Sequence, residues 1–342
     1  MSKTIKSIVL SEPENIFIKK IPYPLKPQNH VLIKVESVGI CGSDIGAYRG
    51  TNPLVTYPRI IGHEIVGTII EAGDGLPENI KVGDRVIVDP YIYCGTCYPC
   101  SIGRTNCCES LKVIGVHIDG GMQEVCSHPA KLVHKIPHNF PVEQAPLIEP
   151  LTIALHALHR AKLIPGEHVV IIGAGAIGLM AALVAMQYEA IPILVDIIDS
   201  RLQHALVCGV PWVLNPEKDN VKDEISRITR GRMAEVVVEA SGANQSIQAS
   251  LDYASFSGRV SLTGWPKEAT QLKTNIITFK ELDIRGARTS AGEFQEAIEL
   301  LATKKIDSTV IVSKIITLEE IPSMVKELSQ HPDKYLKINA VL

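Results

Sequence analysis

The amino-acid sequence predicts an α/β protein of two domains, one rich in β-strands and one built on a doubly wound parallel sheet. The chain has 342 residues, which is more than a single hydrophobic core usually holds. Short apolar runs separated by glycine and proline fill the first 145 residues, whereas strand-like and helix-like segments alternate after Pro150. With 46% apolar and 21% charged residues, the composition is that of a globular protein.

The β-rich part is expected to begin near the N-terminus. Its strands are short runs rich in valine and isoleucine, bounded by glycines that mark turns. These runs are Ser7–Leu10, Val31–Val38, Ile65–Glu71 and Arg85–Val88.

The second part alternates strands with helices, which is typical of a parallel sheet covered on both faces. The expected order is a strand at His168–Ile172, a helix from Ala176, a strand at Ile193–Asp196, a helix after Ser200, and strands at Trp212–Leu214, Ala234–Glu239 and Arg259–Thr263. After Gly286 the pattern predicts two amphipathic helices and a last strand, at Glu293–Thr303, Leu318–Gln330 and Lys337–Val341.

Charge and hydropathy argue against two classes of partner. The net charge is −3 and no lysine- or arginine-rich block is present, so a nucleic-acid partner is not expected. The first residues lack the long apolar segment of a signal peptide, which predicts a cytoplasmic protein. The uncharged stretch Val169–Met186 is long enough to consider as a membrane span, but three glycines interrupt it. We expect a buried strand followed by a buried helix, and no membrane contact.

A glycine-rich motif follows the strand that ends at Ile172 and opens the next helix. Gly173 permits a tight turn, Gly175 lets the backbone approach a pyrophosphate, and Gly178 allows the helix to pack closely on the strand. The free N–H groups at the start of the helix favour an anion. The motif predicts a dinucleotide site formed by Gly173, Gly175, Ala176, Ile177, Gly178, Asp196 and Arg201.

Asp196 ends the next expected strand and decides which dinucleotide is predicted. A carboxylate at this position accepts hydrogen bonds from the ribose hydroxyls of the adenosine half. It would repel a 2′-phosphate, so the predicted cofactor is NAD and not NADP. Arg201 is interpreted as packing along the adenosine ribose.

Five of the eight cysteines fall between residues 94 and 108. In a chain without an export signal, such clustering favours a metal site over disulfides. Four thiolates complete a tetrahedral zinc shell with no position left for substrate, so this zinc would be structural. The spacing assigns three ligands to Cys94, Cys97 and Cys100, and leaves the fourth to Cys107 or Cys108.

A second metal site is predicted from residues scattered through the β-rich part. The candidate ligands are Cys41, His63, Glu64 and Glu149. Thiolate, imidazole and carboxylate together suit a zinc ion with one open position. A hydroxyl bound there loses its proton readily, and its carbon can then yield a hydride to a nicotinamide. Ser43 is placed to receive the hydroxyl proton, and Asp44 to bond the free ring nitrogen of His63.

Over essentially its whole length the chain resembles the zinc-dependent medium-chain alcohol and polyol dehydrogenases. The resemblance rests on Cys41-Gly-Ser-Asp44, Gly62-His-Glu64, the cysteines of residues 94–108, Glu149-Pro150 and the glycine motif. It implies a GroES-like catalytic domain at residues 1–150 and 287–342, and a Rossmann NAD-binding domain at residues 151–286. It also implies an enzyme with one catalytic and one structural zinc ion per chain, assembled as a homodimer or homotetramer.

The resemblance assigns individual residues as well. It implies that Cys108 is the fourth ligand of the structural zinc, and that Cys41 and His63 bind the catalytic zinc. Glu64 and Glu149 both remain candidates for the third catalytic ligand, because members of the family differ there. The family usually has a proton-carrying histidine two residues after the aspartate of the Cys-Gly-Ser-Asp motif. Here that position is Gly46, which leaves water or a cofactor ribose hydroxyl to extend the relay beyond Ser43.

Further motifs are similar to a bacterial sugar-acid branch of the family, which includes L-gulonate 5-dehydrogenases, L-galactonate oxidoreductases and a protein named for starvation sensing. These motifs are Tyr48-Arg-Gly50, Tyr57-Pro-Arg-Ile-Ile-Gly62, Cys97-Tyr-Pro-Cys-Ser-Ile-Gly103, Gly115-Val-His-Ile-Asp-Gly-Gly121 and Ile148-Glu-Pro150. They imply oxidation of a hexonate to a keto-hexonate, such as L-gulonate to D-fructuronate, or oxidation of L-galactonate. The implied substrate residues are Arg288, His117 and Tyr48. The planar fork of Arg288 suits a substrate carboxylate, and a surface or cofactor-phosphate role fits it equally well.

Two other functions stay open at this point. The substrate can be a neutral polyol such as sorbitol, or the amino alcohol L-threonine. Alternatively, the chain is a non-catalytic regulatory protein on a dehydrogenase scaffold, as the starvation-sensing name suggests. The chain contains the metal-ligand candidates Cys41, His63 and Glu64 together with the nucleotide-binding candidate Asp196. This argues against the last alternative, because a protein without catalysis has no physical need for a catalytic metal site and a nucleotide site together.

Overall fold

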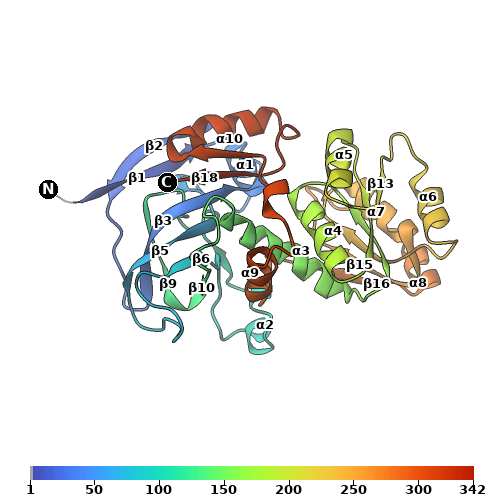
Figure 1. The fold of residues 1–342 in the computed structure, drawn as a ribbon, viewed down its shortest axis with the longest axis horizontal. Helices are drawn as coiled ribbons and strands as arrows, with labels where there is room; N and C mark the ends of the chain where they lie inside the picture. Colours follow the sequence, from blue (N-terminus) through green and yellow to red (C-terminus); the bar gives the residue numbers. More distant parts are fainter. Residues whose placement is uncertain (1–2) are drawn as a thin grey trace. The chain divides into compact units, whose positions relative to one another are not determined.

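The computed structural model describes residues 3–342, and the chain folds into two compact units. Unit 1 comprises Met1–Glu149 and Phe294–Leu342, and unit 2 comprises Pro150–Glu293. The chain thus enters unit 2 at Pro150 and returns to unit 1 at Phe294, later than the residue 287 expected from the resemblance (Figure 1).

Unit 1 is built mainly of strands. Its largest sheet runs in the order β10 (Val133–Lys135), β6 (Arg85–Val88), β5 (Glu64–Ala72), β3 (His30–Ile40), β18 (Ile338–Val341) and β17 (Lys314–Thr317), with β9 (Val125–Pro129) also paired to β3. Two smaller sheets consist of β2 (Asn15–Pro22), β1 (Thr4–Glu12) and β4 (Arg59–Ile60), and of β7 (Tyr91–Ile92) and β8 (Lys112–Val113). The α-helices of this unit are α1 (Gly42–Tyr48), α2 (Tyr98–Ser101), α9 (Phe294–Ala302) and α10 (Ile321–Gln330), while α3 (Ile148–Ala161) begins in unit 1 and continues into unit 2.

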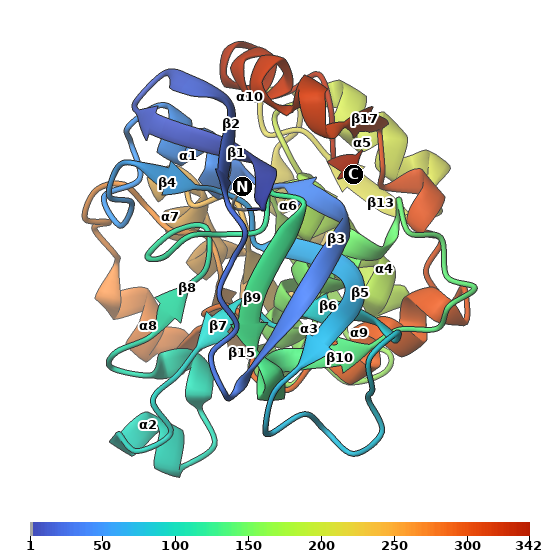
Figure 2. The ribbon, with the colours of Figure 1, turned by 90° about the vertical axis from the view of Figure 1, so that its left-hand side faces the viewer.

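Strands β3 and β5 lie side by side in the large sheet (Figure 2). Both are rich in valine and isoleucine, and several of these side chains belong to the main apolar core of unit 1. The register of three neighbouring strands matters most for the site. Gly39 of β3 lies opposite Glu64 at the start of β5, and Asn339 of β18 lies opposite Gly39 on the other side. The C-terminal strand therefore reaches the segment that carries the Gly62-His-Glu64 motif.

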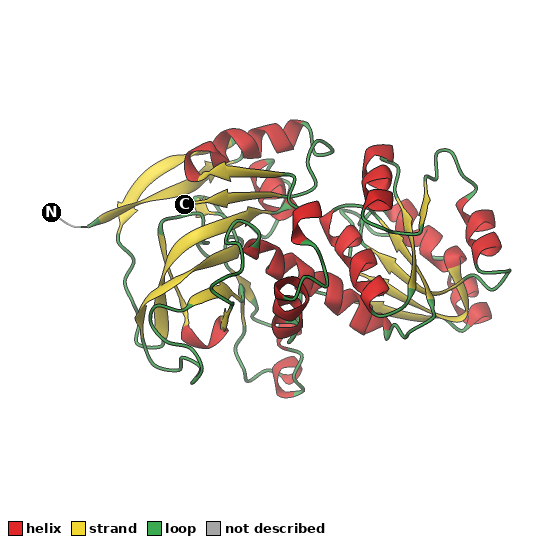
Figure 3. Cartoon of the chain, viewed as in Figure 1, coloured by secondary structure: helices red, strands yellow, loops and turns green. Residues whose placement is uncertain are grey.

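Unit 2 is a parallel sheet covered by helices on both faces (Figure 3). The strand order is β13 (Trp212–Leu214), β12 (Ile191–Val195), β11 (His168–Ile172), β14 (Ala234–Glu239), β15 (Ala254–Leu262) and β16 (Asp283–Gly286), and every pair is parallel. The remaining helices are α4 (Ala176–Gln187), α5 (Asp199–Val207), α6 (Val221–Ile228), α7 (Asn244–Tyr253) and α8 (Thr274–Lys280). This confirms the predicted doubly wound sheet.

The uncharged stretch Val169–Met186 forms strand β11, a turn and helix α4, as predicted. All five residues of β11 are buried, and so is the run Gly178–Ala185 of α4. The apolar character of this stretch is explained by burial within unit 2. Within residues 3–342, no helix combines the length and apolar character needed to cross a membrane.

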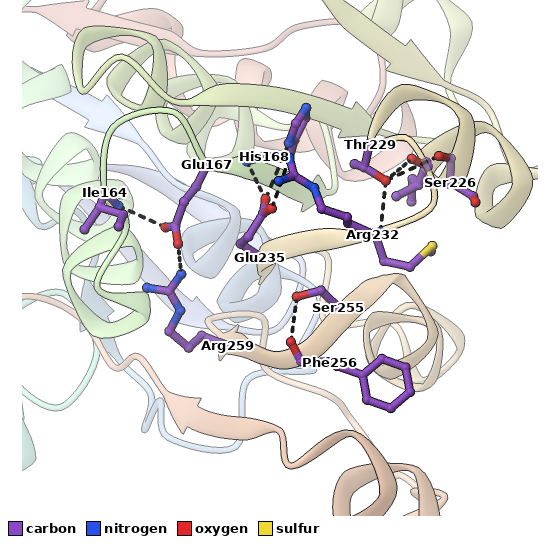
Figure 4. Close-up of polar contacts among 12 residues, drawn as sticks. Ile164, Glu167, His168, Ser226, Thr229, Arg232, Glu235, Ser255, Phe256 and Arg259 are labelled. Atoms are coloured by element: carbon purple, nitrogen blue, oxygen red, sulfur yellow. Dashed lines mark hydrogen bonds and ion pairs between the residues drawn. The ribbon is translucent and has the colours of Figure 1, made fainter.

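Polar contacts join residues near the amino-terminal ends of the parallel strands (Figure 4). The backbone N–H of His168 donates to Oε2 of Glu235 at 2.8 Å, and Arg259 forms an ion pair with Glu167. Arg259 also donates to the carbonyl of Lys162 at 2.6 Å. In sheets of this kind ligands bind at the opposite edge, where the strands end. The glycine motif and Asp196 lie at that carboxyl-terminal edge of unit 2.

Candidate metal and cofactor sites

Unit 1 brings Cys41, His63 and Glu64 together, and we call these three residues the central metal group. One potential ligand atom of each lies within 4.8 Å of the others. Cys41 immediately precedes helix α1, and the β3–β5 register places the start of β5 beside it. Glu64 is fully buried and His63 is 6% exposed. A thiolate, an imidazole and a carboxylate at this spacing fit a zinc ion that keeps one position open.

Asp44 connects the two segments that carry the central metal group. Its Oδ2 accepts a hydrogen bond from the N–H of Cys41 at 2.9 Å, and its Oδ1 accepts one from the N–H of Gly62 at 3.1 Å. The distance from Oδ1 to Nδ1 of His63 is 3.9 Å, which is too long for the hydrogen bond that the sequence suggested. Asp44 therefore acts on His63 through its charge and on the backbone through hydrogen bonds.

The electrostatics of this site follow from burial and from closely spaced charges. Burial raises the pKa of Asp44. Burial also opposes the charged form of His63, but the neighbouring Cys41 and Asp44 outweigh it and raise the pKa of His63 well above its ordinary value. Cys41, Asp44 and Glu149 thus place acidic groups around His63, a set that suits a divalent cation.

Lys337 is a member of this site that the sequence reasoning missed. It directly precedes β18 and is only 5% exposed. Its ammonium group forms an ion pair with Glu64 and donates to the carbonyl of Ile40 at 3.1 Å. Burial lowers the pKa of Lys337, but the charges of Glu64 and Cys41 outweigh this and raise it. No local pattern marks Lys337, because the C-terminal strand brings it to the site from a distant part of the chain.

Gly39 makes room for the Glu64 carboxylate. A Cβ atom at this position would lie 1.7 Å from Oε2 of Glu64 and 3.2 Å from Oδ1 of Asn339. Any side chain at Gly39 would therefore displace Glu64 from its place beside Lys337, Cys41 and His63. In the sequence, Gly39 directly follows the expected strand Val31–Val38 and indicates only a turn.

Glu149 has a different environment from Glu64. It lies in the first turn of α3, is 1% exposed, and its Oε1 accepts a hydrogen bond from the hydroxyl of Tyr91. Burial raises the pKa of Glu149 to about 7 and that of Tyr91 well above its ordinary value. Among the described residues, the set of ligand atoms within 4.8 Å includes Glu64 and not Glu149. Tyr91 was also missed, since nothing near it in sequence suggests a partner.

The other predicted residues are distributed over both units. Oγ of Ser43 is buried and has no hydrogen-bond partner among residues 3–342, so it is available to a bound hydroxyl. Tyr48 lies in the apolar core of unit 1, and Nδ1 of His117 accepts from the N–H of Val113 at 3.0 Å. Arg288 is exposed and belongs to unit 2. The substrate roles of Tyr48, His117 and Arg288 stay predictions.

The second group of thiols lies in residues 94–108, which we call the cysteine loop. Sγ atoms of Cys94, Cys97, Cys100 and Cys108 lie within 4.8 Å of one another, and Cys107 does not belong to this set. The backbone N–H groups of Thr96 and Cys97 each donate to Sγ of Cys94 at 3.4 Å. These donors lower the pKa of the Cys94 thiol to about 5. Four converging sulfurs fit a zinc ion whose shell is closed.

The glycine motif of unit 2 has the geometry that its sequence predicts. Gly173 has a φ of +107°, and a Cβ atom at Gly178 would lie 1.7 Å from the carbonyl oxygen of Gly173. A Cβ atom at Gly175 would meet nothing within 4 Å, which leaves the start of α4 open to a ligand.

Asp196 follows β12 and is fixed beside this motif. Its Oδ2 accepts from the N–H of Ala174 at 2.6 Å, and its Oδ1 accepts from the N–H of Ile198 at 2.8 Å. Nη1 of Arg201 lies 3.9 Å from Oδ2 of Asp196. The carboxylate therefore stands next to the glycine turn, where the adenosine ribose of a dinucleotide binds in this fold.

Comparisons with known proteins give the same picture over both units. The alcohol dehydrogenase GroES-like domain matches residues 27–138, and the zinc-binding dehydrogenase domain matches residues 176–303. An uncharacterized zinc-type alcohol dehydrogenase-like protein of Haemophilus influenzae is 66% identical over 341 residues, covering 100% of both chains. L-galactonate-5-dehydrogenase of Escherichia coli K12 is 34% identical over 311 residues, covering 91% of each. An alcohol dehydrogenase of E. coli CFT073, solved with NADH, superposes with a TM-score of 0.93 at 33% identity, covering 99% of each chain.

Proposed function

Because the chain belongs to the zinc-dependent medium-chain alcohol and polyol dehydrogenases, we propose that it oxidises a secondary hydroxyl of a hexonate to a ketone, with NAD as the acceptor. Membership of the family makes the protein an oxidoreductase that acts on CH–OH groups. The observation that carries the proposal is the central metal group, in a chain similar over 91% of its length to an L-galactonate dehydrogenase. The best candidate reactions are L-gulonate to D-fructuronate and the oxidation of L-galactonate.

Different residues of unit 1 have different roles in the proposed reaction. Cys41, His63 and Glu64 would hold the catalytic zinc, and bound zinc and NAD would supply hydroxyl polarisation and hydride uptake. Oγ of Ser43 would accept the proton of the substrate hydroxyl. Asp44 keeps the segments of Cys41 and Gly62 in register, so that the ligands meet at one point.

The choice of NAD rests on Asp196. Its carboxylate is held by two backbone N–H groups at the end of β12 and carries a negative charge where a 2′-phosphate would be placed. We expect KM for NAD to be far below KM for NADP. Comparable values would contradict the role given to Asp196.

The substrate is tested by following NADH formation by absorbance with the zinc-loaded protein. The panel contains L-gulonate, L-galactonate, L-idonate, sorbitol and L-threonine. Turnover of a hexonate supports the proposal. Turnover of sorbitol or L-threonine alone would keep the zinc and NAD chemistry and reject the sugar-acid substrate. Binding of NAD without turnover of any compound would favour a regulatory role.

Arg288 separates the substrate classes more finely. If its guanidinium binds the hexonate carboxylate, Arg288→Ala should raise KM for the hexonate at least about tenfold and leave KM for a neutral polyol unchanged. Arg288→Lys keeps the charge and loses the fork, so its effect should be intermediate. Equal losses on both substrates would place Arg288 outside the substrate site.

A further inference from the structure

Trp265 is a large aromatic side chain left open to solvent at the functional edge of unit 2. It is one of two tryptophans in the chain, and 75% of its surface is exposed. It lies in the turn after β15, at the edge where parallel strands end and ligands of such sheets bind. Trp265 therefore presents an aromatic ring at the edge where a ligand of this sheet would lie.

The backbone that carries Trp265 is held by Glu239. This residue ends β14 and is fully buried. Its carboxylate accepts from the N–H groups of Ser241 at 2.9 Å and Gly242 at 3.0 Å. Its carbonyl oxygen accepts from the N–H groups of Thr263 at 2.9 Å and Gly264 at 3.0 Å. One residue therefore fixes both the turn after β14 and the turn after β15.

Two glycines let these turns interlock. A Cβ atom at Gly264 would lie 2.1 Å from the N atom of Gly242 and 2.5 Å from Oε2 of Glu239. A Cβ atom at Gly242, where φ is +71°, would lie 3.0 Å from both N and O of Trp265. The main chain at Trp265 is thus tightly packed while its indole is uncovered.

The strand order indicates which part of a dinucleotide would reach this ring. The glycine motif follows β11, and Asp196 follows β12 on one side of it. Strands β14 and β15 lie on the other side of β11. The strand order reverses between β11 and β14, and a dinucleotide binds across this point of the sheet. If its adenosine half lies beside Asp196, its nicotinamide half lies at the ends of β14 and β15.

We propose that the indole of Trp265 contacts the nicotinamide ring of bound NAD, and that the Glu239-linked turns position it for this contact. The inference rests on the proposed use of a nicotinamide cofactor and adds the residue that touches its reactive half. The oxidised ring is a cation, and the face of an indole attracts cations more strongly than any other side-chain ring. The contact should therefore favour NAD over NADH.

The test measures dissociation constants by calorimetry for NAD, NADH and ADP-ribose, which lacks the nicotinamide. Trp265→Ala should weaken NAD binding about two- to thirtyfold, weaken NADH less, and leave ADP-ribose unchanged. Trp265→Phe should restore most of the NAD affinity. Trp212→Ala is the matched control, because Trp212 lies at the start of β13 and not at the carboxyl-terminal edge, and it should change none of the three constants.

The outcomes separate this contact from the choice of cofactor. Unchanged NAD binding in Trp265→Ala would overturn the proposal, and so would equal weakening of NAD and ADP-ribose, which indicates only a disturbed loop. If the wild-type protein binds NADP and not NAD, the cofactor assignment is wrong. The same comparison of NADP with 2′-phospho-ADP-ribose then still decides the role of Trp265.

Discussion

The cysteine loop and the central metal group are both candidate zinc sites of unit 1, but they are built in opposite ways. The cysteine loop takes all four sulfurs from residues 94–108, and its first cysteine is exposed. The central metal group joins Cys41 to His63 and Glu64, and its surroundings add Glu149 and Lys337 from later parts of the chain. The first site is local and uniform in chemistry, whereas the second is buried and mixed.

This difference fits different tasks. Four thiolates close the zinc shell and make a rigid cross-link of a loop with little other regular structure. The central metal group offers three ligands, so one position stays open for a substrate hydroxyl. Its extra partners, Lys337 on Glu64 and Asp44 on the backbone, hold ligands in place without filling that position.

The largest expected effect is on catalysis at the central metal group. Cys41→Ser should lower kcat/KM for the accepted substrate by about a thousandfold or more. The reason is that the zinc ion stabilises the negative charge that develops on the substrate oxygen in the transition state by several kcal/mol. The matched control is Cys126→Ser, since Cys126 is a buried core cysteine outside both metal groups. The measurement is kcat/KM of both variants with the compound that the wild-type protein oxidises. If Cys41→Ser kept more than a tenth of the wild-type activity, Cys41 would not be a ligand of the catalytic zinc ion.

Substitution in the cysteine loop should act on stability and not on chemistry. Cys108→Ser should remove about one zinc ion per chain and lower the free energy of unfolding by several kcal/mol, as expected for a structural zinc. Cys107→Ser, one residue away and outside the set of converging sulfurs, should change neither. Metal analysis and urea unfolding of the two variants measure the contrast. Loss of zinc from Cys107→Ser would reassign the fourth ligand.

The same contrast explains what the sequence could predict. The cysteine loop is a local pattern, and the alternation of strands and helices in unit 2 is a periodic one, so both were predicted from residues close together in the chain. Cys41, His63 and Glu64 were found because each sits in a short motif. Lys337, Tyr91 and the space at Gly39 depend on strand pairing between β18, β3 and β5 and on the position of β7, which no local window contains.

Lys337 tests whether these distant partners matter. Lys337→Met would leave the buried Glu64 carboxylate without its cation, which typically costs about 3–5 kcal/mol of stability. Bound zinc should offset part of this loss, so urea unfolding should show a larger effect after chelation than in the zinc-loaded protein. Lys337→Arg keeps the charge and should behave more like the wild type. A loss of equal size with and without metal would mean that Lys337 only fills space.

The smallest predicted effect concerns His128. This residue contacts Asp89, at the start of a segment that carries Tyr91, the partner of Glu149, and continues into the cysteine loop. Its Nε2 donates to the carbonyl of Asp89 at 2.9 Å, and from there the chain runs through Tyr91 into the cysteine loop. Burial lowers the pKa of His128 to about 3, so the folded protein keeps it neutral.

The sign of the pH effect follows from this shift. The unfolded chain takes up a proton at His128 near its ordinary pKa of about 6.5, whereas the folded protein does so only near 3. Stability is therefore lost as pH falls between these values, by about 2 kcal/mol at pH ~5 for this residue. His128→Gln retains a donor for Asp89 and cannot titrate, so urea unfolding of the variant should lose about that much less between pH ~7 and ~5 than the wild type. Parallel pH curves for the two proteins would mean that His128 takes up its proton in the folded protein at its ordinary pKa, and that burial does not keep it neutral.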